Sequence, residues 1–392
     1  MRWLKAELFW IAVVAFVASG PVCLGDEAPE ADEMPSAPSV VAHFHLSGTV
    51  TEAPVVDPFG FTLGQITSLK DLVRRLDAAS TDDKVEAVVL THDSMYLGFG
   101  QLQEIRQAIG RAKNAGKTVY VHAEGMTTFN YALLCAGDHL SVAPQSSLWL
   151  MGIYGEGLYV NNLLEKIGVD ADFMHMGAYK SAAEMLTRTG PSEEAEENIN
   201  WVFDSYYDSL VNMIAESRDM TSEQVRRLID EGPYMADAAL DKGLIDAIET
   251  REAFVRRVKE EIGGQVKVDN RYGREDAMQI NLANPLAFFS ILAELFKTPA
   301  VSQKDALAIV YVEGTILPGH SQPTLFGASG AAFSGDIRKA LETAAKDKSV
   351  KAVVMRVDSP GGSAEASEVI LNATRQVKAS KPFIVSMGDV AG

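Results

Sequence analysis

The sequence predicts an α/β protein with mostly parallel sheets, made of two tandem copies of one domain of which the second is incomplete. Short apolar runs typical of buried strands alternate with segments of helical spacing, as in βαβ units. Several segments of the first half recur in the second at a nearly constant offset, from 266 positions (Gly48 and Gly314) to 264 positions (Lys117 and Lys381). Such an offset over separate segments indicates a duplicated domain.

The first copy, residues 40–263, is expected to alternate strands with helices. The run 85–90 is largely apolar, as in a strand that parallel neighbours bury on both faces. Gly116 stands where a helix should stop, and Thr221 can cap the start of a helix. The expected strands are 40–46, 85–90, 118–122 and 140–143, and the expected helices are 69–79, 102–115, 129–135, 194–218 and 222–231.

The second copy, residues 306–392, repeats this order. At the same offset its last residue, Gly392, corresponds to Thr128, so the rest of the first copy has no counterpart. Residues 264–305 are interpreted as a linker, polar and irregular over 264–284 and apolar over 286–296, where a core or interfacial helix is expected. The expected strands are 307–312, 352–357 and 383–387, and the expected helices are 334–345 and 364–379.

The N-terminus is typical of a targeting segment. Arg2 and Lys5 precede the apolar run 8–19, and small residues follow, so residues 1–25 are expected to be a signal peptide or a membrane anchor. The run is shorter than the ~20 residues of a spanning helix, which favours cleavage. Residues 26–39 are acidic and contain Pro and Ser, as in a disordered tether. In either case the protein is expected to be exported.

Composition excludes several function classes. The net charge of −18 and pI near 4.8 argue against nucleic acid as a partner and against polybasic docking to anionic lipid. Two cysteines allow no disulfide framework or CxxC metal site, and the seven histidines show no metal-ligand spacing. We therefore expect no metal and no other cofactor.

The segment 358–362, Asp-Ser-Pro-Gly-Gly, follows directly on an expected strand and precedes an expected helix. Glycines let a ligand approach backbone N–H groups closely, and two such donors aimed at one point make an oxyanion hole. An ordinary tight turn explains the same residues. Ser359 and Ser363 are nucleophiles by type, but turn and cap roles explain both.

Lys180 is flanked by small residues with few charges close by. If these flanks remove it from water, the neutral amine is favoured and can act as a base. A solvated lysine is the alternative, and local composition favours it. Four histidines (His92, His122, His139 and His175) have no paired Asp or Glu spacing and are interpreted as buried or surface side chains.

Residues 387–392, Met-Gly-Asp-Val-Ala-Gly, begin at the end of an expected strand. Small residues at a strand-to-helix junction suit a nucleophile elbow, although a plain strand end explains them equally. No nucleophile is visible in this segment.

Together these motifs resemble the long, duplicated form of bacterial signal peptide peptidases, the SppA or protease IV family. The resemblance covers roughly residues 40–392 and is carried by Gly-Ala-Tyr-Lys-Ser at 177–181, Asp-Ser-Pro-Gly-Gly at 358–362, Ser-Met-Gly-Asp-Val-Ala at 386–391 and the tandem repeat. It implies a crotonase-like or ClpP-like fold in each half. It also implies a Ser–Lys dyad shared between the halves, with no cofactor.

In that family pattern, Lys180 is the general base and the amides of Gly361 and Gly362 hold the oxyanion. The nucleophilic serine is expected directly after Gly392 and is therefore absent from this chain, which is expected to be an inactive fragment. The first copy offers no replacement, because Phe129 stands at the serine position and residues 95–97, Met-Tyr-Leu, replace Pro-Gly-Gly.

The resemblance further implies short apolar peptides, the remnants of signal peptides, as substrates. It implies a ring-like, tetramer-like homo-oligomer at the membrane surface, on the periplasmic side of the inner membrane. Met151, Gly152 and Ile153 could line an apolar substrate groove, and a core strand is the alternative for their segment. Two other functions stay open: a crotonase-like acyl-CoA enzyme and a non-catalytic envelope scaffold.

Overall fold

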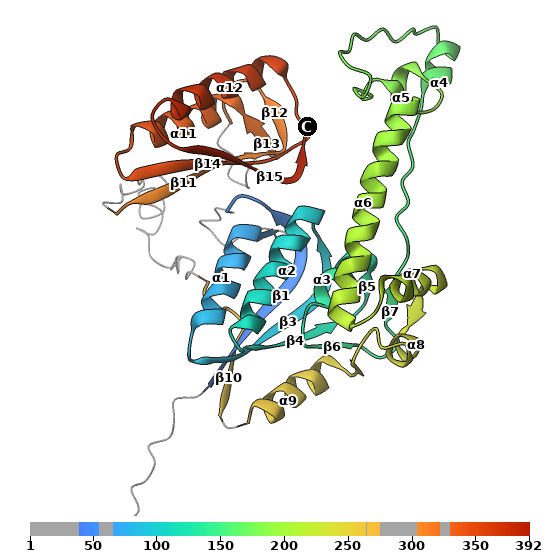
Figure 1. Cartoon of the computed structure of the whole chain (residues 1–392), viewed down its shortest axis with the longest axis vertical. Helices are drawn as coiled ribbons and strands as arrows, with labels where there is room; N and C mark the ends of the chain where they lie inside the picture. Colours follow the sequence, from blue (N-terminus) through green and yellow to red (C-terminus); the bar gives the residue numbers. More distant parts are fainter. Residues whose placement is uncertain (1–38, 55–65, 264, 275–303, 322–329) are drawn as a thin grey trace, which may run out of the picture. The chain divides into compact units, whose positions relative to one another are not determined.

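The computed structural model describes residues 39–54, 66–263, 265–274, 304–321 and 330–392 (Figure 1). The expected leader, nearly all of the tether and the apolar segment 286–296 lie outside the described residues. In the part that is described, no helix is both long and apolar enough to cross a bilayer.

The first half contains a seven-stranded sheet in which every strand pair is parallel, in the order β10-β1-β3-β4-β6-β9 with β2 also beside β1. This confirms the parallel α/β architecture expected from the alternating pattern. The strands are β1 (Ser39–Thr51), β2 (Ile66–Ser68), β3 (Val85–Tyr96), β4 (Thr118–Ala123), β6 (His139–Val142), β9 (Ala247–Ile248) and β10 (Val266–Asp269).

Helices cover both faces of this sheet (Figure 1). On one face lie α1 (Leu69–Thr81), α2 (Phe99–Asn114) and α3 (Thr128–Leu134), and on the other lies α9 (Arg251–Ile262). Alternate side chains of the strands enter the two cores: Leu90 packs with the first group, whereas Val89 packs with Phe254 of α9. Two-sided burial explains why these strands read as continuous apolar runs.

The first half also contains a small three-stranded sheet, and a set of helices lies between β6 and β9 in the chain. The sheet pairs β5 (Met126–Thr127), β7 (Ser147–Trp149) and β8 (Tyr234–Met235). The longest helix, α6, begins after Ser192, whose hydroxyl accepts from Ala195 N–H. Thr221 caps α7 as expected. The helices are α4 (Asn161–Lys166), α5 (Glu184–Thr187), α6 (Glu193–Arg218), α7 (Ser222–Glu231) and α8 (Ala236–Asp241).

The second half contains a parallel three-stranded sheet, β11-β14-β15, with a separate parallel pair, β12-β13. Helices α11 and α12 lie on one face of the three-stranded sheet (Figure 1), where Leu341, Val353 and Val377 are buried. The elements are β11 (Ala306–Glu313), β12 (Thr315–Leu317), β13 (Ala331–Phe333), α11 (Ser334–Lys346), β14 (Val350–Ser359), α12 (Ala364–Lys378) and β15 (Phe383–Ala391).

One expectation about the linker is wrong. Residues 266–269 are not irregular but form β10, an edge strand parallel to β1. Val266 and Val268 pack beside Val41 and Phe254, in the core beneath α9. Apolar and polar residues alternate over only these four positions, and the neighbouring residues are polar. The pattern is too short to predict a strand from the sequence. The other domain boundaries stay predictions.

Candidate functional site

A glycine turn follows β14 at the carboxyl end of the second sheet. Gly361 has φ +93° and Gly362 has φ +157°, backbone conformations that L side chains rarely adopt. β12 runs directly beside the turn: Ile316 N–H donates to Gly361 O at 2.9 Å, and Ser363 N–H donates to Ile316 O at 2.9 Å. A Cβ on Gly362 would lie 2.1 Å from Ile316 O, so only glycine fits there.

The two amides expected in an oxyanion hole differ in their partners. Gly361 N–H donates to Ser359 Oγ at 3.1 Å. Gly362 N–H has no hydrogen-bond partner within the described segments. Ser359 is buried and Ser363 caps α12 by accepting from Ala366 N–H at 3.2 Å, so both serines have the turn and cap roles that their residue types indicated.

The end of β15 lies against this turn. Gly392 N–H donates to Ser359 O at 2.9 Å, and a Cβ on Gly392 would lie 2.6 Å from Pro360 O. The expected end of the strand at Met387 is wrong, because β15 stays extended through Ala391. The reason is the pairing of Ala391 with Ser359, beyond the bulge between Val357 and Ser359, which prolongs the strand. The nucleophile elbow stays a prediction.

The Asp358 carboxylate fixes the same strand end. Its Oδ1 accepts from Asp389 N–H at 3.0 Å and from Val390 N–H at 2.8 Å. A Cβ on Gly388 would lie 2.9 Å from Asp358 Cβ, so this glycine lets the strands approach closely. The motifs at 358–362 and 386–391, which are 24 or more residues apart in the chain, therefore form one structural unit.

Lys180 lies in the segment between α4 and α5, and its side chain is exposed. Its ammonium group makes no hydrogen bond or ion pair within the described residues, and no contact joins it to Gly361 or Gly362 there. Removal of Lys180 from water, which its small flanks suggested, is therefore not found in this chain alone. The neighbouring Tyr179 is anchored, since its hydroxyl donates to Glu197 Oε2 on α6 at 2.7 Å.

The proposed groove residues follow β7. Thr128 Oγ1 contacts both the N–H and the O of Met151, at 2.8 and 2.7 Å. Met151 and Gly152 are exposed and Ile153 is half-buried, whereas Leu150 is fully buried. Leu150 thus belongs to the core, Met151 and Gly152 lie at the surface, and Ile153 packs partly against the core.

Large apolar side chains are exposed along the same stretch of chain. Tyr154 is 83% exposed and Trp201 is 69% exposed. Large apolar side chains that are exposed together can mark a binding or assembly site. Other large apolar side chains that are exposed on this stretch include Leu158, Leu163, Ile167, Phe173, Met174, Met176 and Tyr179.

A charge cluster that the sequence did not reveal joins the two halves. Arg356 on β14 pairs with the buried Glu52 at 2.9 Å and with Glu104 on α2 at 2.7 Å. It also donates to Ser386 Oγ on β15 at 2.9 Å. Burial by itself lowers the pKa of the Arg356 guanidinium, but the two carboxylates outweigh burial and raise that pKa.

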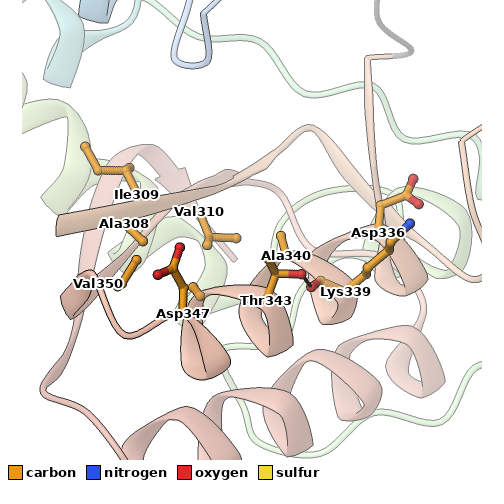
Figure 2. A pocket seen from close by; sticks show the side chains of 10 residues that line it. Ala308, Ile309, Val310, Asp336, Lys339, Ala340, Thr343, Asp347 and Val350 are labelled. Atoms are coloured by element: carbon orange, nitrogen blue, oxygen red, sulfur yellow. Dashed lines mark hydrogen bonds between the residues drawn. The ribbon is translucent and has the colours of Figure 1, made fainter. Parts of the chain in front are cut away.

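Two hollows of the described structure lie away from the proposed catalytic residues. Figure 2 shows one of about 480 Å³ between β11 and α11, lined by residues that include Ile309 and Lys339. Another, of about 430 Å³, lies beside Glu104 and Arg356. Neither is lined by Lys180, Gly361 or Gly362.

The four histidines are buried or surface side chains, as interpreted from the sequence. His92 and His122 are buried, and burial lowers the pKa of both, to about 4 for His92. His139 and His175 are exposed. Among the described residues, no three His, Cys, Asp or Glu side chains are grouped so that they could hold a metal ion.

Comparisons with known proteins match this chain to proteases and peptidases. The family model described as peptidase family S49 matches residues 111–265. Over 325 residues, or 82% of the chain, the protein is 31% identical to Protease 4 of Haemophilus influenzae. It is 26% identical over 83% of its length to the chloroplastic serine protease SPPA of Arabidopsis thaliana, and 27% identical over 49% to a putative signal peptide peptidase SppA of Enterococcus faecium.

These matches confirm the resemblance to SppA-type proteases and the crotonase-like or ClpP-like α/β fold that it implies. The chain spans about half the length of these relatives: 51%, 46% and 56%. All three relatives are named as proteases or peptidases, and none of the three is named as an acyl-CoA enzyme.

Proposed function

We propose that this chain is part of a serine peptidase of the SppA type, which cleaves short apolar peptides such as signal-peptide remnants. The family match and the names of the relatives support the peptidase class. The observation that carries the proposal is the contact between the end of β15 and the glycine turn, since Gly392 N–H donates to Ser359 O at 2.9 Å.

In this proposal the nucleophile is a serine directly after Gly392 in the complete protein. A residue at that position would emerge beside the turn of Gly361 and Gly362, because a Cβ on Gly361 would lie 3.9 Å from the Gly392 carbonyl carbon. Gly362 is the stronger candidate for the oxyanion donor, because the Gly361 amide already donates to Ser359 Oγ.

Lys180 would be the general base. The neutral amine takes the serine hydroxyl proton, the serine oxygen bonds to the peptide carbonyl carbon, and the carbonyl oxygen becomes the oxyanion. Protonated Lys180 gives its proton to the leaving amine as the peptide C–N bond breaks. Water then attacks the acyl-enzyme while Lys180 takes a water proton, and Lys180 returns it to the serine oxygen as the ester bond breaks.

Lys180 is exposed in the isolated chain, so a covering group would have to favour its neutral form. The exposed apolar side chains between Tyr154 and Trp201 support two such groups. One is an apolar peptide bound along Met151, Gly152 and Ile153. The other is a further copy of the chain in a ring-like homo-oligomer, exported and held at the membrane surface of the envelope.

The test uses the complete protein that contains this chain. Lys180→Ala should abolish hydrolysis of short apolar peptides, by about 1,000-fold or more, because a dyad loses its base. Lys166→Ala, another exposed lysine of the same region, is the matched control and should leave the activity unchanged. Wild-type activity in Lys180→Ala would remove Lys180 from the mechanism.

The nucleophile has its own test. A fluorophosphonate probe should label the serine after Gly392 in the wild-type protein, and replacement of that serine by alanine should prevent labelling. A reading frame that encodes another residue at this position contradicts the proposed dyad.

A further inference from the structure

The N-cap residue of helix α2 has no side chain, although Gln101 Oε1 of the same helix accepts from the N–H of this residue at 3.0 Å. This N-cap residue is Gly98, which has no side-chain oxygen to accept the first N–H groups of the helix. The corresponding helix of the second half, α12, has Ser363 as its N-cap, and Ser363 Oγ accepts from Ala366 N–H at 3.2 Å. Gly98 and Ser363 are 265 positions apart, at the offset of the repeat.

A carboxylate of the second half takes the place of the missing cap. Asp389 Oδ1 accepts from Phe99 N–H at 2.5 Å and from Gly100 N–H at 3.3 Å. A Cβ on Gly98 would lie 2.2 Å from Asp389 Cγ, so the glycine makes room for this carboxylate. The negative charge also lies at the positive end of the helix dipole.

Asp389 is itself held at the proposed active site. Asp358 Oδ1 accepts from the N–H groups of Asp389 and Val390 at 3.0 and 2.8 Å. Three residues after Asp389, Gly392 contacts the turn that contains Gly361 and Gly362. The carboxylate therefore ties the start of α2 to the strand end that would carry the nucleophile.

The start of α2 is connected in turn to the segment that carries Lys180. The ring of Phe99 stacks on Tyr206 of α6, with centroids 4.6 Å apart and planes at 16°. Burial and the nearby Asp389 both raise the pKa of Tyr206. About 14 Å along the same helix, at 1.5 Å per residue, Glu197 accepts from the hydroxyl of Tyr179, the neighbour of Lys180.

We propose that Asp389 is a positioning residue that sets the nucleophile-bearing end of β15 against the half that provides Lys180. The inference rests on the proposed function. A dyad divided between two halves works only if the halves are held in register, and a misplacement of 1 Å can lower the rate about 100-fold. A contact across the halves at the strand end itself is suited to hold that register.

Activity measurements on the complete protein test this role. Asp389→Ala should lower kcat for a short apolar peptide about 30-fold to 100-fold with KM changed less than about threefold, because alignment rather than binding is lost. Asp389→Asn keeps an acceptor oxygen without the charge and should lose less, about threefold to tenfold.

Glu313→Ala is the matched control. Its carboxylate also crosses between the halves, accepting from Glu52 N–H at 2.9 Å and Ala53 N–H at 3.0 Å, but from the end of β11. It should change kcat less than about threefold, since β15 keeps its contacts. Equal losses of kcat in Glu313→Ala and Asp389→Ala would overturn the proposal, because any loosening of the halves would then suffice.

Amide hydrogen exchange on the 392-residue chain gives a readout that needs no activity. In Asp389→Ala, exchange of the Phe99 and Gly100 amides should accelerate about tenfold, whereas Glu313→Ala should accelerate the Glu52 and Ala53 amides instead. Unchanged exchange at Phe99 and Gly100 overturns the proposal. If the wild-type protein has no peptidase activity, the proposed function fails, and the exchange result still decides whether Asp389 caps α2.

Discussion

The two halves of the molecule share an order of long strands and helices, from β1 to β4 in the first half and from β11 to β15 in the second. Single residues also make corresponding contacts in the two halves. In each, a glycine with positive φ interrupts the first strand segment, at Gly48 (+73°) and Gly314 (+80°). In each, a lysine donates to two backbone carbonyls near the end of a helix. Lys117, just before β4, donates to Asp82 O and Val85 O after α1. Lys381, just before β15, donates to Ala344 O and Asp347 O at the end of α11. Contacts made to the backbone are thus alike in both halves.

The halves differ where their second long strand ends. In the first half, β3 continues past Ser94 and pairs to Tyr96 with β1. In the second half, β14 stops at Ser359 and the chain turns through Pro360, Gly361 and Gly362. One framework thus supports either a strand that continues, as in β3, or a turn whose Gly362 N–H has no hydrogen-bond partner among the described residues. A few residues decide between the two.

The largest expected effect concerns the turn. Gly362→Ala should destabilise the second half by about 3 kcal/mol or more, because the new Cβ would meet Ile316 O at 2.1 Å in a strained conformation. At the matching position of the first half, Leu97→Ala should lower stability by only about 1 kcal/mol, since Leu97 is half-buried. Urea unfolding of both variants measures the difference, and equal midpoints would break the comparison.

The second prediction concerns acid sensitivity of the first half. Burial lowers the pKa of His92 to about 4, below the value of about 6.5 in an unfolded chain, so stability is full above pH 6.5 and is lost as the pH falls toward 4. The loss amounts to about 3 kcal/mol. His92→Val introduces the residue found at the matching position 357. This variant should lose less stability between pH 6.5 and 4 than the wild-type protein.

Some dependence of stability on pH should remain in His92→Val, because burial also lowers the pKa of His43 and of His122. The second half should respond at lower pH. Hydrogen bonds from Ser321 and His320 lower the pKa of Asp336 to about 2, so its stabilisation is present above about pH 3.8 and lost toward pH 2. Hydrogen exchange in each half between pH 7 and 2 checks both statements, and an unchanged pH dependence of the first half in His92→Val contradicts the first.

The third prediction tests the shared lysines. Lys117→Met and Lys381→Met keep most of the apolar stem but remove two hydrogen bonds to backbone carbonyls in each half, so each should destabilise its half by about 2 kcal/mol. Thermal unfolding of the two variants measures this. A loss in only one half would show that the matched lysines do not have matched tasks.

The smallest expected effect concerns the helix caps. Ser363→Ala should weaken the first turn of α12 by about 1 kcal/mol, the usual value for a lost cap. Asp389→Ala should weaken the first turn of α2 by a similar amount, about 1 kcal/mol, although the cap comes from the other half. Local opening measured by hydrogen exchange compares them, and an effect of Asp389→Ala on α12 alone would contradict a cap across the halves.

Much of the fold could be predicted from local patterns. The order of strands and helices in both halves, the cap at Thr221 and the helix stop near Gly116 follow from periodicity and from cap and turn chemistry. β10 could not be predicted, because four residues with weak alternation depend on the β1 edge for their hydrogen bonds.

The candidate site could be predicted in part. The glycine turn is visible in the sequence, because a strand that ends in Pro-Gly-Gly needs positive φ. The task of Asp389 is not visible from its neighbours, since its partners are 289 and 290 residues away. One local signal existed: position 98 is glycine, whereas the residue 265 positions later is the capping Ser363.

The sequence by itself determined the parallel α/β class, the repeated order of elements and the glycine turn, because each depends on residues close together in the chain. Only the tertiary structure decided that Arg356 pairs with Glu52 and that Asp389 caps α2, and it left Lys180 exposed. These properties depend on which surfaces come into contact although they are hundreds of residues apart in the chain. The residues next to a charged group in the sequence do not determine the distance to its partner.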